Sequence, residues 1–286
     1  MSSAFTIEDL RFRYPTSKED TIKGVSFDVK EGEIFGLLGP SGAGKSTTQK
    51  ILIKLLENYR GNIEYFGKDL KAKGKSFYEE IGVGFEMPVH FSKMTAAENL
   101  NFFSEFYKNK ANVKELMERV GLWEYKDIKV GEYSKGMKVR LNFIRAMLNN
   151  PRVLFLDEVT NGLDPKNAYV IKEMIAEFRE KGGTVFLSTH LMNDVEQLCD
   201  RIAFCVDGKL HEISTPRDLK LKYGKREVKV EYRENGDVLS ETFPLNGIGS
   251  NERFNSVLKD KEIETIHSGE TSMEEIFIIV TGVDVK

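Results

Sequence analysis

The stretch GPSGAGKST (Gly39–Thr47) decides the fold, because it matches the pattern GxxxxGK[ST] in full. The apolar stretch EIFGLL (33–38) precedes it, and the helical stretch TTQKILIKLL (47–56) follows. Glycines let a backbone wrap around phosphate groups, and the N-terminus of a helix favours an anion. This context makes a Gly-rich surface turn a poor alternative. The stretch therefore predicts a phosphate-binding loop, with Lys45 on the β and γ phosphates of a nucleotide and Ser46 on Mg²⁺.

Two adjacent acids end a second apolar run, VLFLDE (153–158). A lone acid at a strand end is ordinarily a solvated residue. Two acids downstream of a phosphate-binding loop instead suggest a metal-side acid and a general base. We expect Asp157 to hold Mg²⁺ through water and Glu158 to polarise the water that attacks the γ-phosphate.

The positions of Ser134 and His190 relative to these motifs suggest a functional role for each. Ser134 is a plausible cap of the helix that runs to Asn149, and one helix and one strand fill the gap from Ser134 to Asp157. His190 ends the apolar run TVFLSTH, where a lone histidine is more often a core or edge residue. Behind a phosphate-binding loop, it becomes a candidate contact of the γ-phosphate. The other histidines show no metal-ligand spacing, so we expect no metal site made by the protein alone.

The stretch IGVGFEMP (81–88) is an apolar run that stops on Glu86 before a proline. A carboxylate at this place is either a solvated strand end or part of a site. The run itself does not decide between them.

Composition excludes several classes of protein. The 286 residues are 40% apolar and 30% charged, with a formal net charge of −3, which is ordinary for a globular protein. Without a basic excess, a nucleic-acid partner is not favoured. No apolar run approaches the roughly 18 residues of a membrane span, and the charged N-terminal stretch does not resemble a signal peptide. We therefore expect a soluble, cytoplasmic chain, with its two cysteines reduced.

The order of patterns along the chain predicts four segments. Short alternating runs over 4–36 predict antiparallel strands, and the region 95–149 looks helical throughout, with a cap at Thr95. The continuous apolar runs VLFLD and TVFLS suit parallel strands that are buried on both faces. In the tail, Asn235-Gly236 predicts the turn of a hairpin. We expect a first part of the core at 1–87, a helical subdomain at 88–150, a second part of the core at 151–215 and an accessory domain at 216–286.

Together these motifs resemble the nucleotide-binding subunit of an ATP-binding cassette (ABC) transporter. GPSGAGKST resembles the Walker A motif, VLFLDE resembles Walker B, and YSKGM (133–137) resembles the signature LSGGQ. NGLD (161–164) resembles the D-loop, and His190 the switch histidine. The resemblance implies nucleotide contacts at Tyr14, Gly39, Pro40, Ser41, Gly42, Ala43, Gly44, Lys45, Ser46, Thr47, Ser134, Gly136 and Asp164. Phe12 is a less favoured choice than Tyr14 for stacking on adenine.

The resemblance also implies a fold and a mode of action. The fold is α/β, a P-loop NTPase with an ABC-type antiparallel β subdomain, an inserted helical subdomain and a small C-terminal α+β domain. Two cassettes, as a homodimer or with a paralogous partner, pair head to tail and hold ATP and Mg²⁺ between Walker A of one and the signature of the other. ATP hydrolysis then drives a separate membrane-spanning permease subunit, which holds the chain on the inner face of the membrane. The phrases YSKGM, DEVTNGLDP and LSTHLMNDVEQLCDR look most like the ATPase subunits of multidrug, antibiotic and lipid or polysaccharide exporters.

This sequence departs from the family pattern at three places. Lys135 replaces a glycine of the signature, and Val159 stands where proline usually follows the catalytic glutamate. Glu86 stands at the Q-loop position, where the family has glutamine. We expect Glu86 to be a catalytic residue together with Glu158 and His190, and a metal-binding residue together with Ser46 and Asp157. The alternative is that its side chain points away, towards a basic group of the membrane partner.

Two other functions remain open from the sequence. A nucleotide sensor would bind ATP without turning it over, and the acid at Glu86 keeps this possibility open. A soluble ABC-type ATPase would act on ribosomes or DNA, but such proteins carry two cassettes or a long coiled coil, and neither is visible here.

Overall fold

The computed structural model describes residues 2–87, 89–269 and 271–284. The chain forms two compact units, one of Met1–Pro216 with Val283–Lys286 and the other of Arg217–Gly282. Pro88, where we expect the helical subdomain to begin, lies outside the described residues. Within the described ranges, no helix is both long and apolar enough to cross a membrane.

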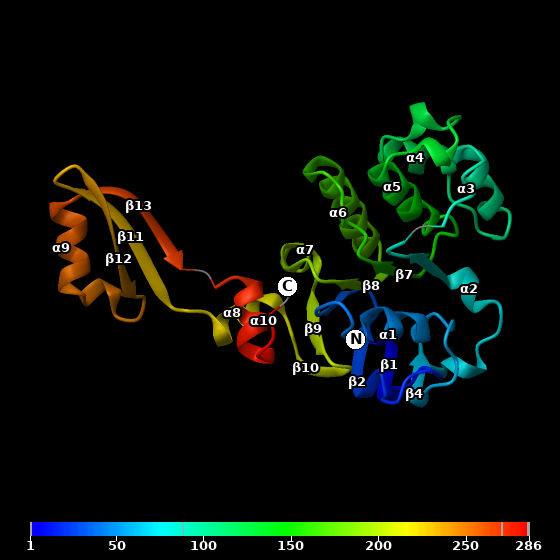
Figure 1. Ribbon diagram of the computed structural model, residues 1–286, viewed down its shortest axis with the longest axis horizontal. Coiled ribbons are helices and arrows are strands. Elements are labelled where there is room, and N and C mark those ends of the chain that lie inside the picture. Colours follow the sequence, from blue (N-terminus) through cyan, green and yellow to red (C-terminus); the bar gives the residue numbers. More distant parts are fainter. Residues whose placement is uncertain (1, 88, 270, 285–286) are drawn as a thin grey trace. The chain divides into compact units, whose positions relative to one another are not determined.

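A mostly parallel sheet forms the centre of the first unit, with the strand order β10-β9-β3-β8-β7-β6 (Figure 1). β3, β7 and β8 are buried along their whole length, which is why their sequences are continuous apolar runs. Their parallel pairing confirms the expected α/β core. The strands are β3 (Ile34–Leu38), β6 (Ile81–Gly84), β7 (Val153–Asp157), β8 (Thr184–Thr189), β9 (Arg201–Val206) and β10 (Lys209–Ser214).

This sheet positions the candidate site residues. Strands β6, β7, β8 and β3 lie side by side and parallel, so their carboxyl ends meet at one edge. The loop at Gly39 leaves β3 there, Glu86 follows β6, Glu158 follows β7 and His190 follows β8. Ligands of open α/β sheets bind at this edge.

A second, antiparallel sheet with the order β2-β1-β4-β5 packs on the first through aromatic side chains. Phe27 stacks on Phe35 of β3 with ring centroids 5.4 Å apart, and Phe5 meets Phe155 of β7 edge-on at 5.6 Å. The strands are β1 (Ser3–Phe12), β2 (Ile22–Lys30), β4 (Arg60–Tyr65) and β5 (Lys68–Asp69). This sheet is the expected antiparallel β subdomain.

Helices cover the parallel sheet and fill the segment between β6 and β7. α1 and α6 contact β8, α5 contacts β6, and α7 contacts β3. The helices of this unit are α1 (Lys45–Leu52), α2 (Phe77–Glu80), α3 (Ala96–Ser104), α4 (Val113–Arg119), α5 (Lys135–Arg145), α6 (Pro165–Glu180) and α7 (Met192–Leu198), with the 3-10 turns η1 (Leu70–Ala72), η2 (Trp123–Tyr125) and η3 (Val130–Glu132).

The inserted segment is less helical than the sequence pattern predicts. The predicted cap is confirmed: Thr95 and Glu98 form a reciprocal capping box at the start of α3. However, the region is not helical throughout, because non-helical segments and short 3-10 turns separate α3, α4 and α5. Gly121 follows the end of α4 with φ of 65°, a left-handed conformation that ends helices. α5 ends at Arg145, earlier than the predicted Asn149.

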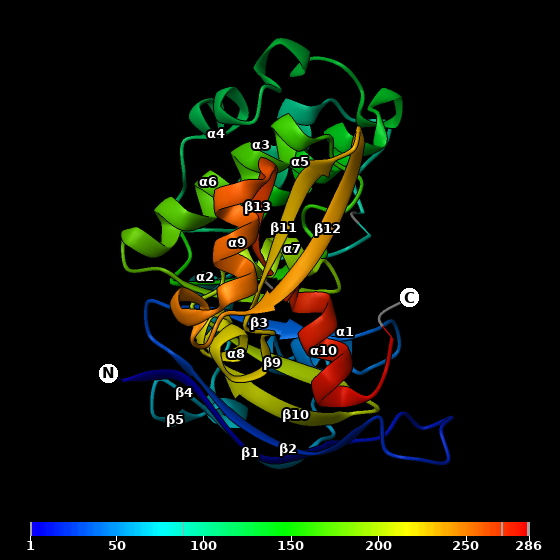
Figure 2. The same ribbon diagram turned by 90° about the vertical axis from the view of Figure 1, so that its left-hand side faces the viewer.

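The second unit is a three-stranded antiparallel sheet, β12-β11-β13, with α9 lying along one face (Figure 2). The predicted hairpin turn is confirmed, because Asn235 and Gly236 both have positive φ, of 53° and 90°, as a type I′ turn requires. Val230, Tyr232 and Val257 belong to its small core. The elements are α8 (Pro216–Tyr223), β11 (Glu227–Glu234), β12 (Asp237–Pro244), η4 (Ile248–Ser250), α9 (Glu252–Asp260), β13 (Glu262–Gly269) and α10 (Met273–Thr281).

Candidate active site

The glycines of the loop between β3 and α1 allow other groups to approach its backbone closely. A Cβ on Gly39 would lie 2.0 Å from the backbone oxygen of Cys205, so only glycine fits there. Gly44 caps α1 with φ of 105°, a conformation that side chains disfavour. Within the described part of the chain, no side chain caps this helix, and the first N–H groups of any α-helix lack intrahelical acceptors. The loop therefore presents backbone donors that suit a phosphate group.

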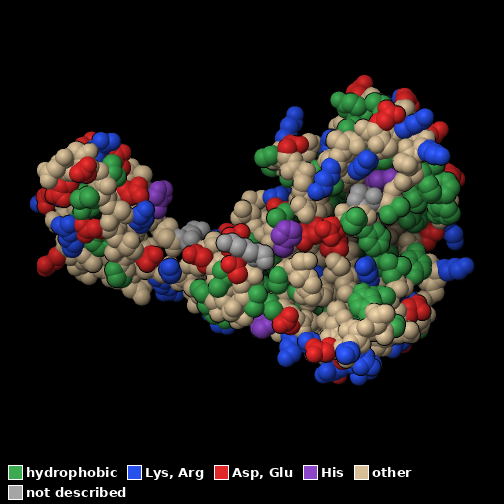
Figure 3. Space-filling view, in the orientation of Figure 1, with side chains coloured by type: hydrophobic (Ala, Val, Ile, Leu, Met, Phe, Trp, Pro, Cys, Tyr) green, Lys and Arg blue, Asp and Glu red, His purple; other side chains and the backbone are tan. Residues whose placement is uncertain are grey.

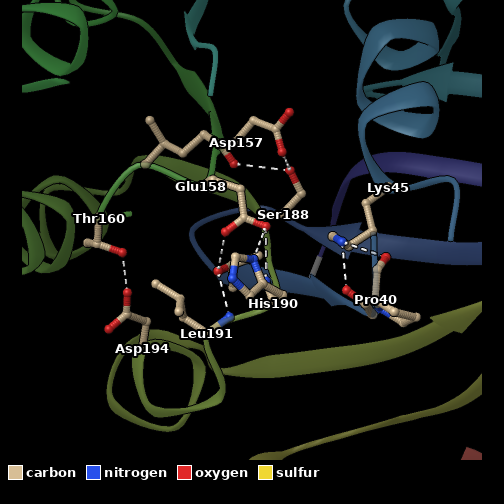
Figure 4. Close-up of polar contacts among 12 residues, drawn as sticks. Pro40, Lys45, Asp157, Glu158, Thr160, Ser188, His190, Leu191 and Asp194 are labelled. Atoms are coloured by element: carbon tan, nitrogen blue, oxygen red, sulfur yellow. Dashed lines mark hydrogen bonds and ion pairs between the residues drawn. The ribbon is translucent and has the colours of Figure 1, made fainter. Parts of the chain in front are cut away.

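Lys45 lies buried behind this loop, with 7% of its surface exposed. Its Nζ donates hydrogen bonds to the backbone oxygens of Gly39, at 2.6 Å, and Pro40, at 3.1 Å (Figure 4). Burial lowers the pKa of Lys45 below its ordinary value, although the nearby carboxylates of Glu158 and Asp157 oppose the shift. The Lys45 ammonium group has only neutral carbonyl oxygens as hydrogen-bond partners, so it can bind a more negative group instead.

A cavity of about 480 Å³, called the loop cavity below, brings four sequence motifs together. Its walls combine the phosphate-binding loop with the predicted Q-loop, Walker B and switch residues. It is lined by Thr21, Ser41, Gly42, Ala43, Gly44, Lys45, Ser46, Thr47, Glu86, Glu158 and His190. Residues from four separate strand ends thus face one space.

Glu158 is held tightly although it faces this cavity. Its Oε1 accepts hydrogen bonds from the backbone N–H of His190, at 3.1 Å, and from the ring Nδ1, at 2.8 Å. Its Oε2 accepts from the hydroxyl of Thr189 at 3.0 Å. Glu158 also has φ of 51°, which costs a non-glycine residue roughly 1–3 kcal/mol. Such strain at a carboxylate in a cavity is typical of a functional residue.

Asp157 is anchored from the neighbouring strand. Its Oδ1 accepts a hydrogen bond of 2.5 Å from the hydroxyl of Ser188 in β8, which also lies 3.0 Å from Oε1 of Gln49 in α1. Asp157 is 6% exposed and Gln49 is 1% exposed. The carboxylate therefore has a fixed orientation relative to the helix that carries Lys45 and Ser46.

Ser46, Asp157 and Glu86 together line a second cavity of about 750 Å³, called the apolar groove below. It adjoins the loop cavity, because Ser46 and Glu86 line both. Most of its lining is hydrophobic. It is lined by Ser46, Lys50, Ile53, Leu55, Tyr78, Ile81, Val83, Phe85, Glu86, Met87, Val89, Phe103, Tyr107, Arg145, Ala146 and Asp157. Figure 3 shows exposed hydrophobic side chains gathered around α2 and α3, where Phe91, Phe102 and Phe106 pack edge to face.

The side-chain oxygens of Ser46, Asp157 and Glu86 supply only part of the ligands that Mg²⁺ needs. A hydroxyl and two carboxylates are hard ligands of the kind that Mg²⁺ prefers. Among the described residues, no cluster of three or more His, Cys, Asp or Glu side chains could hold a metal ion. Mg²⁺ usually keeps several waters and binds one or two carboxylates together with substrate phosphates. The residues therefore fit an ion that arrives with a nucleotide.

Glu86 is exposed, and α5 contacts the backbone of Phe85 before it and of Val89 after it. The Asn142 side-chain amide donates to the backbone oxygen of Phe85 at 2.8 Å, and Arg145 donates to that of Val89 at 2.5 Å. Arg145 also donates to Asn142 Oδ1 at 2.9 Å, which joins the two contacts. Neither residue was singled out from the sequence, because a polar residue inside a helical pattern does not reveal which loop it meets.

The predicted signature residues lie outside the loop cavity. Ser134 caps α5, its hydroxyl accepting from the N–H of Met137 at 3.2 Å, as the sequence predicts. Asp164 likewise caps α6, and the amide groups of Asn167 hold its pKa below the ordinary value. Of the described residues that line the loop cavity, none is Ser134, Gly136 or Asp164. Within one chain, the structure thus does not bring the signature and Walker A together.

Tyr14 touches the phosphate-binding loop, whereas Phe12 belongs to the core. The Tyr14 hydroxyl shares a hydrogen bond of 3.2 Å with that of Thr47. Phe12 is 4% exposed and meets the Tyr14 ring edge-on at 4.9 Å. Tyr14 is therefore the better placed of the two to meet a base, although it is not among the described residues lining the loop cavity.

Comparisons with known proteins match two parts of the chain to family models and most of its length to curated proteins. The family described as ABC transporter matches residues 22–161, and the family described as fluoroquinolone efflux ABC transporter C-terminal domain matches residues 226–270. The chain is 46% identical over 278 residues to the fluoroquinolones export ATP-binding protein of Mycobacterium tuberculosis, covering 96% of this chain and 92% of that protein. It is 37% identical over 212 residues to a linearmycin resistance ATP-binding protein of Bacillus subtilis, covering 72% and 68%.

A solved structure of the ATP-binding subunit of an ABC transporter superposes with a TM-score of 0.71 at 28% identity, covering 78% of this chain and 94% of that one. The shared cassette thus extends over the core that carries the loop cavity. On sequence, fold and site together, the chain belongs to the ABC transporter family, among its ATP-binding and ATP-hydrolysing subunits.

Proposed function

We propose that this chain hydrolyses ATP bound between its own phosphate-binding loop and the signature of a second cassette, and that this drives export through a membrane-spanning permease. The observation that carries the proposal is the loop cavity, in which Lys45, Glu158 and His190 face one space while Ser134 lies elsewhere. One chain holds one half of each site. A homodimer, or a pair with a paralogous cassette, supplies the other half.

Each residue of the loop cavity has a role in this proposal. Lys45 leaves the backbone oxygens of Gly39 and Pro40 for the β and γ phosphates, which are stronger acceptors of a charged donor. Glu158 orients the attacking water and takes its proton as the bond between the γ-phosphorus and the bridging oxygen breaks. His190 fixes the Glu158 carboxylate through its Nδ1–H, and its Nε2 donates to the γ-phosphate only when that nitrogen also carries a proton. Tyr14 stacks on adenine.

Ser46, Asp157 and Glu86 would hold Mg²⁺, which supplies charge neutralisation at the phosphates when it is bound. Ser188 and Gln49 keep Asp157 oriented for this task. Glu86 brings an oxygen as glutamine would, together with a negative charge that the family pattern lacks. That charge makes nucleotide binding more dependent on the metal.

The second cassette contributes Ser134 and Gly136 in the proposed pair. Ser134 caps α5 and Gly136 lies in its first turn, so the positive N-terminal end of this helix would point to the bound γ-phosphate in trans. Lys135 extends over the D-loop, where a Cβ on Gly162 would lie 3.1 Å from its Nζ. Lys135 therefore carries a positive charge to the surface where the two cassettes meet.

The apolar groove suits the permease partner. Leu55, Met87 and Val89 are 56%, 82% and 80% exposed, which is unusual for a surface that meets only water. The groove lies beside Glu86, so a partner seated there would sense the nucleotide state. The permease would keep the chain at the inner face of the cell membrane, in the cytoplasm. No nucleic-acid partner is proposed.

The cargo class follows from similarity to exporters of antibiotics. One relative is named for fluoroquinolones export and another for linearmycin resistance. The match of the tail to a fluoroquinolone efflux domain extends this similarity beyond the cassette. We therefore propose a drug exporter whose cargo includes fluoroquinolones.

Co-expression with a candidate permease, for example a membrane protein encoded by a neighbouring gene, tests this function. The two proteins should purify together, and vesicles containing both should accumulate a fluoroquinolone only when MgATP is added. Vesicles with the Glu158→Gln chain are the control. ATP turnover without transport of any antibiotic would contradict export, and binding of ATP without turnover would contradict the proposed reaction.

A further inference from the structure

A buried hydrogen bond joins the segment after Glu158 to the segment after His190. The Thr160 hydroxyl donates to Oδ2 of Asp194, and the two residues are 7% and 8% exposed. Thr160 lies two positions beyond Glu158, and Asp194 lies in the first turn of α7, four positions beyond His190. Figure 4 shows this pair on the side of Glu158 away from Lys45.

Lys172 of α6 supplies the charge that this buried carboxylate needs. Its Nζ lies 2.5 Å from Oδ1 of Asp194 and 2.9 Å from Oε1 of Gln197. Each oxygen of Asp194 thus has its own partner, from α6 on one side and from Thr160 on the other. A buried charge with complete partners is stable in one geometry, and losing one partner leaves an unpaired charge.

Two side-chain bridges connect these segments, in addition to the backbone hydrogen bond from the N–H of Glu158 to the oxygen of Ser188 at 2.9 Å. The first is the set of hydrogen bonds that the Glu158 carboxylate accepts from Thr189 and His190. This first bridge weakens whenever the Glu158 carboxylate binds a water molecule, because the same two oxygens make both sets of hydrogen bonds. The second bridge, from Thr160 to Asp194, uses no atom of Glu158. It can keep the segments together during the reaction.

Val159 makes this second bridge more important here. It stands between Glu158 and Thr160 without the fixed φ that a proline would give. Glu158 itself has a left-handed backbone, with φ of 51°. The backbone is thus strained at Glu158, and Thr160 is the first residue after it whose side chain is anchored by a hydrogen bond.

We propose that Asp194, with Thr160 and Lys172, is a positioning residue that holds Glu158 and His190 in register for hydrolysis. The inference deepens the proposed function and rests on Glu158 and His190 acting as assigned there. Asp194 touches neither nucleotide nor water in this role. It acts by fixing the distance between the two segments that carry the reacting groups.

The test compares variants of the full chain in ATP affinity and in turnover. Asp194→Ala and Thr160→Val should lower kcat between about tenfold and about a hundredfold, as small misplacements of reacting groups do. Affinity for a non-hydrolysable ATP analogue should stay within about twofold, because binding depends on the phosphate-binding loop. Thr160→Ser keeps the hydroxyl and should retain turnover. The double variant with Asp194→Ala and Thr160→Val should be no slower than Asp194→Ala alone, because both substitutions remove the same bridge.

Asn193→Ala is the matched control, because Asn193 is the exposed neighbour of Asp194 on α7. Turnover of Asp194→Ala within twofold of the unaltered chain would overturn the proposal. So would an equal loss of turnover and ATP affinity, which marks a merely structural role.

A second readout does not need turnover and so separates this inference from the proposed reaction. The imidazole resonances of labelled His190, assigned with His190→Gln, report the contact between its Nδ1 and Glu158. Asp194→Ala and Thr160→Val should shift them, whereas Thr160→Ser and Asn193→Ala should not. Unchanged resonances in Asp194→Ala would overturn the positioning role even if the chain proved to bind ATP without hydrolysing it.

Discussion

Oε1 of Glu158 accepts two hydrogen bonds from His190, one from the backbone N–H at 3.1 Å and one from the ring Nδ1 at 2.8 Å. Because a carboxylate oxygen only accepts, the proton of a neutral His190 ring lies on Nδ1, and Nε2 is left free. The pair therefore fixes the tautomer of one residue and the orientation of the other. Its consequences can be measured.

Replacing His190 by Ala should lower kcat by about 10² to 10³, a range typical of groups that assist proton transfer, with a smaller effect on KM. Glu158 would keep the bonds from Thr189 and from the backbone but lose its ring partner. Steady-state ATPase kinetics measure the change. The exposed His211 offers a control, and equal effects of His190→Ala and His211→Ala would contradict the assignment.

Glu158→Gln should abolish turnover but preserve ATP binding, because the amide cannot take the proton from water. ATP would then persist between two cassettes. We expect a stable dimer that forms only with ATP and dissociates when ATP is removed, visible by size-exclusion chromatography with light scattering. A variant that stays monomeric with saturating ATP would argue against a site shared by two chains.

Glu86→Gln restores the residue that the family pattern has at this position. Removing one negative charge from the wall of the loop cavity should change the dependence of ATPase activity on Mg²⁺ concentration or the catalytic rate. Titration of Mg²⁺ at fixed ATP measures both. Identical kinetics of the two proteins at every Mg²⁺ concentration would exclude contact between Glu86 and the metal.

His90 should make the inserted helical segment sensitive to acid. Its Nε2 donates to the backbone oxygen of Lys138 at 3.2 Å, while burial, with the nearby charge of Arg145, lowers its pKa to about 4. The unfolded chain binds the proton from about pH 6.5 downwards. Stability is therefore full above pH 6.5 and is lost as pH falls towards 4, by roughly 2 kcal/mol at pH 5.

Urea unfolding at pH 7 and pH 5 measures this loss. His90→Gln keeps a side-chain donor but cannot bind a proton, so it should lose less stability between the two pH values than the unaltered chain. An equal loss in both proteins would assign the effect to other groups.

Much of this architecture could be predicted from the sequence because its signals are local. GPSGAGKST carries its own strand, turn and helix, and the apolar runs ending at Asp157 and Thr189 are buried on both faces as expected. The hairpin at Asn235-Gly236 and the caps at Thr95 and Ser134 are likewise properties of a few adjacent residues.

The partners that orient the site could not be predicted, because they are distant in sequence and chemically ordinary. Ser188 reaches Asp157 from the next strand, and Asp194 reaches Thr160 from a later helix. The local sequence predicts only that each of these two residues lies in a strand or a helix, and it does not indicate the distant partner. The extent of helix in the inserted segment was overestimated for a related reason, since glycines such as Gly121 end helices inside an otherwise helical pattern.

The contacts of α5 have one more consequence. Asn142 and Arg145, near its C-terminal end, hold the backbone around Glu86, and Ser134 caps the other end. A helix of 11 residues is rigid over about 16 Å, so a shift at Glu86 is carried to Ser134 with little loss. In a pair of cassettes, each nucleotide would adjust the surface offered to the other. ATP binding should then be cooperative, with a Hill coefficient above one that falls towards one when Asn142 and Arg145 are replaced.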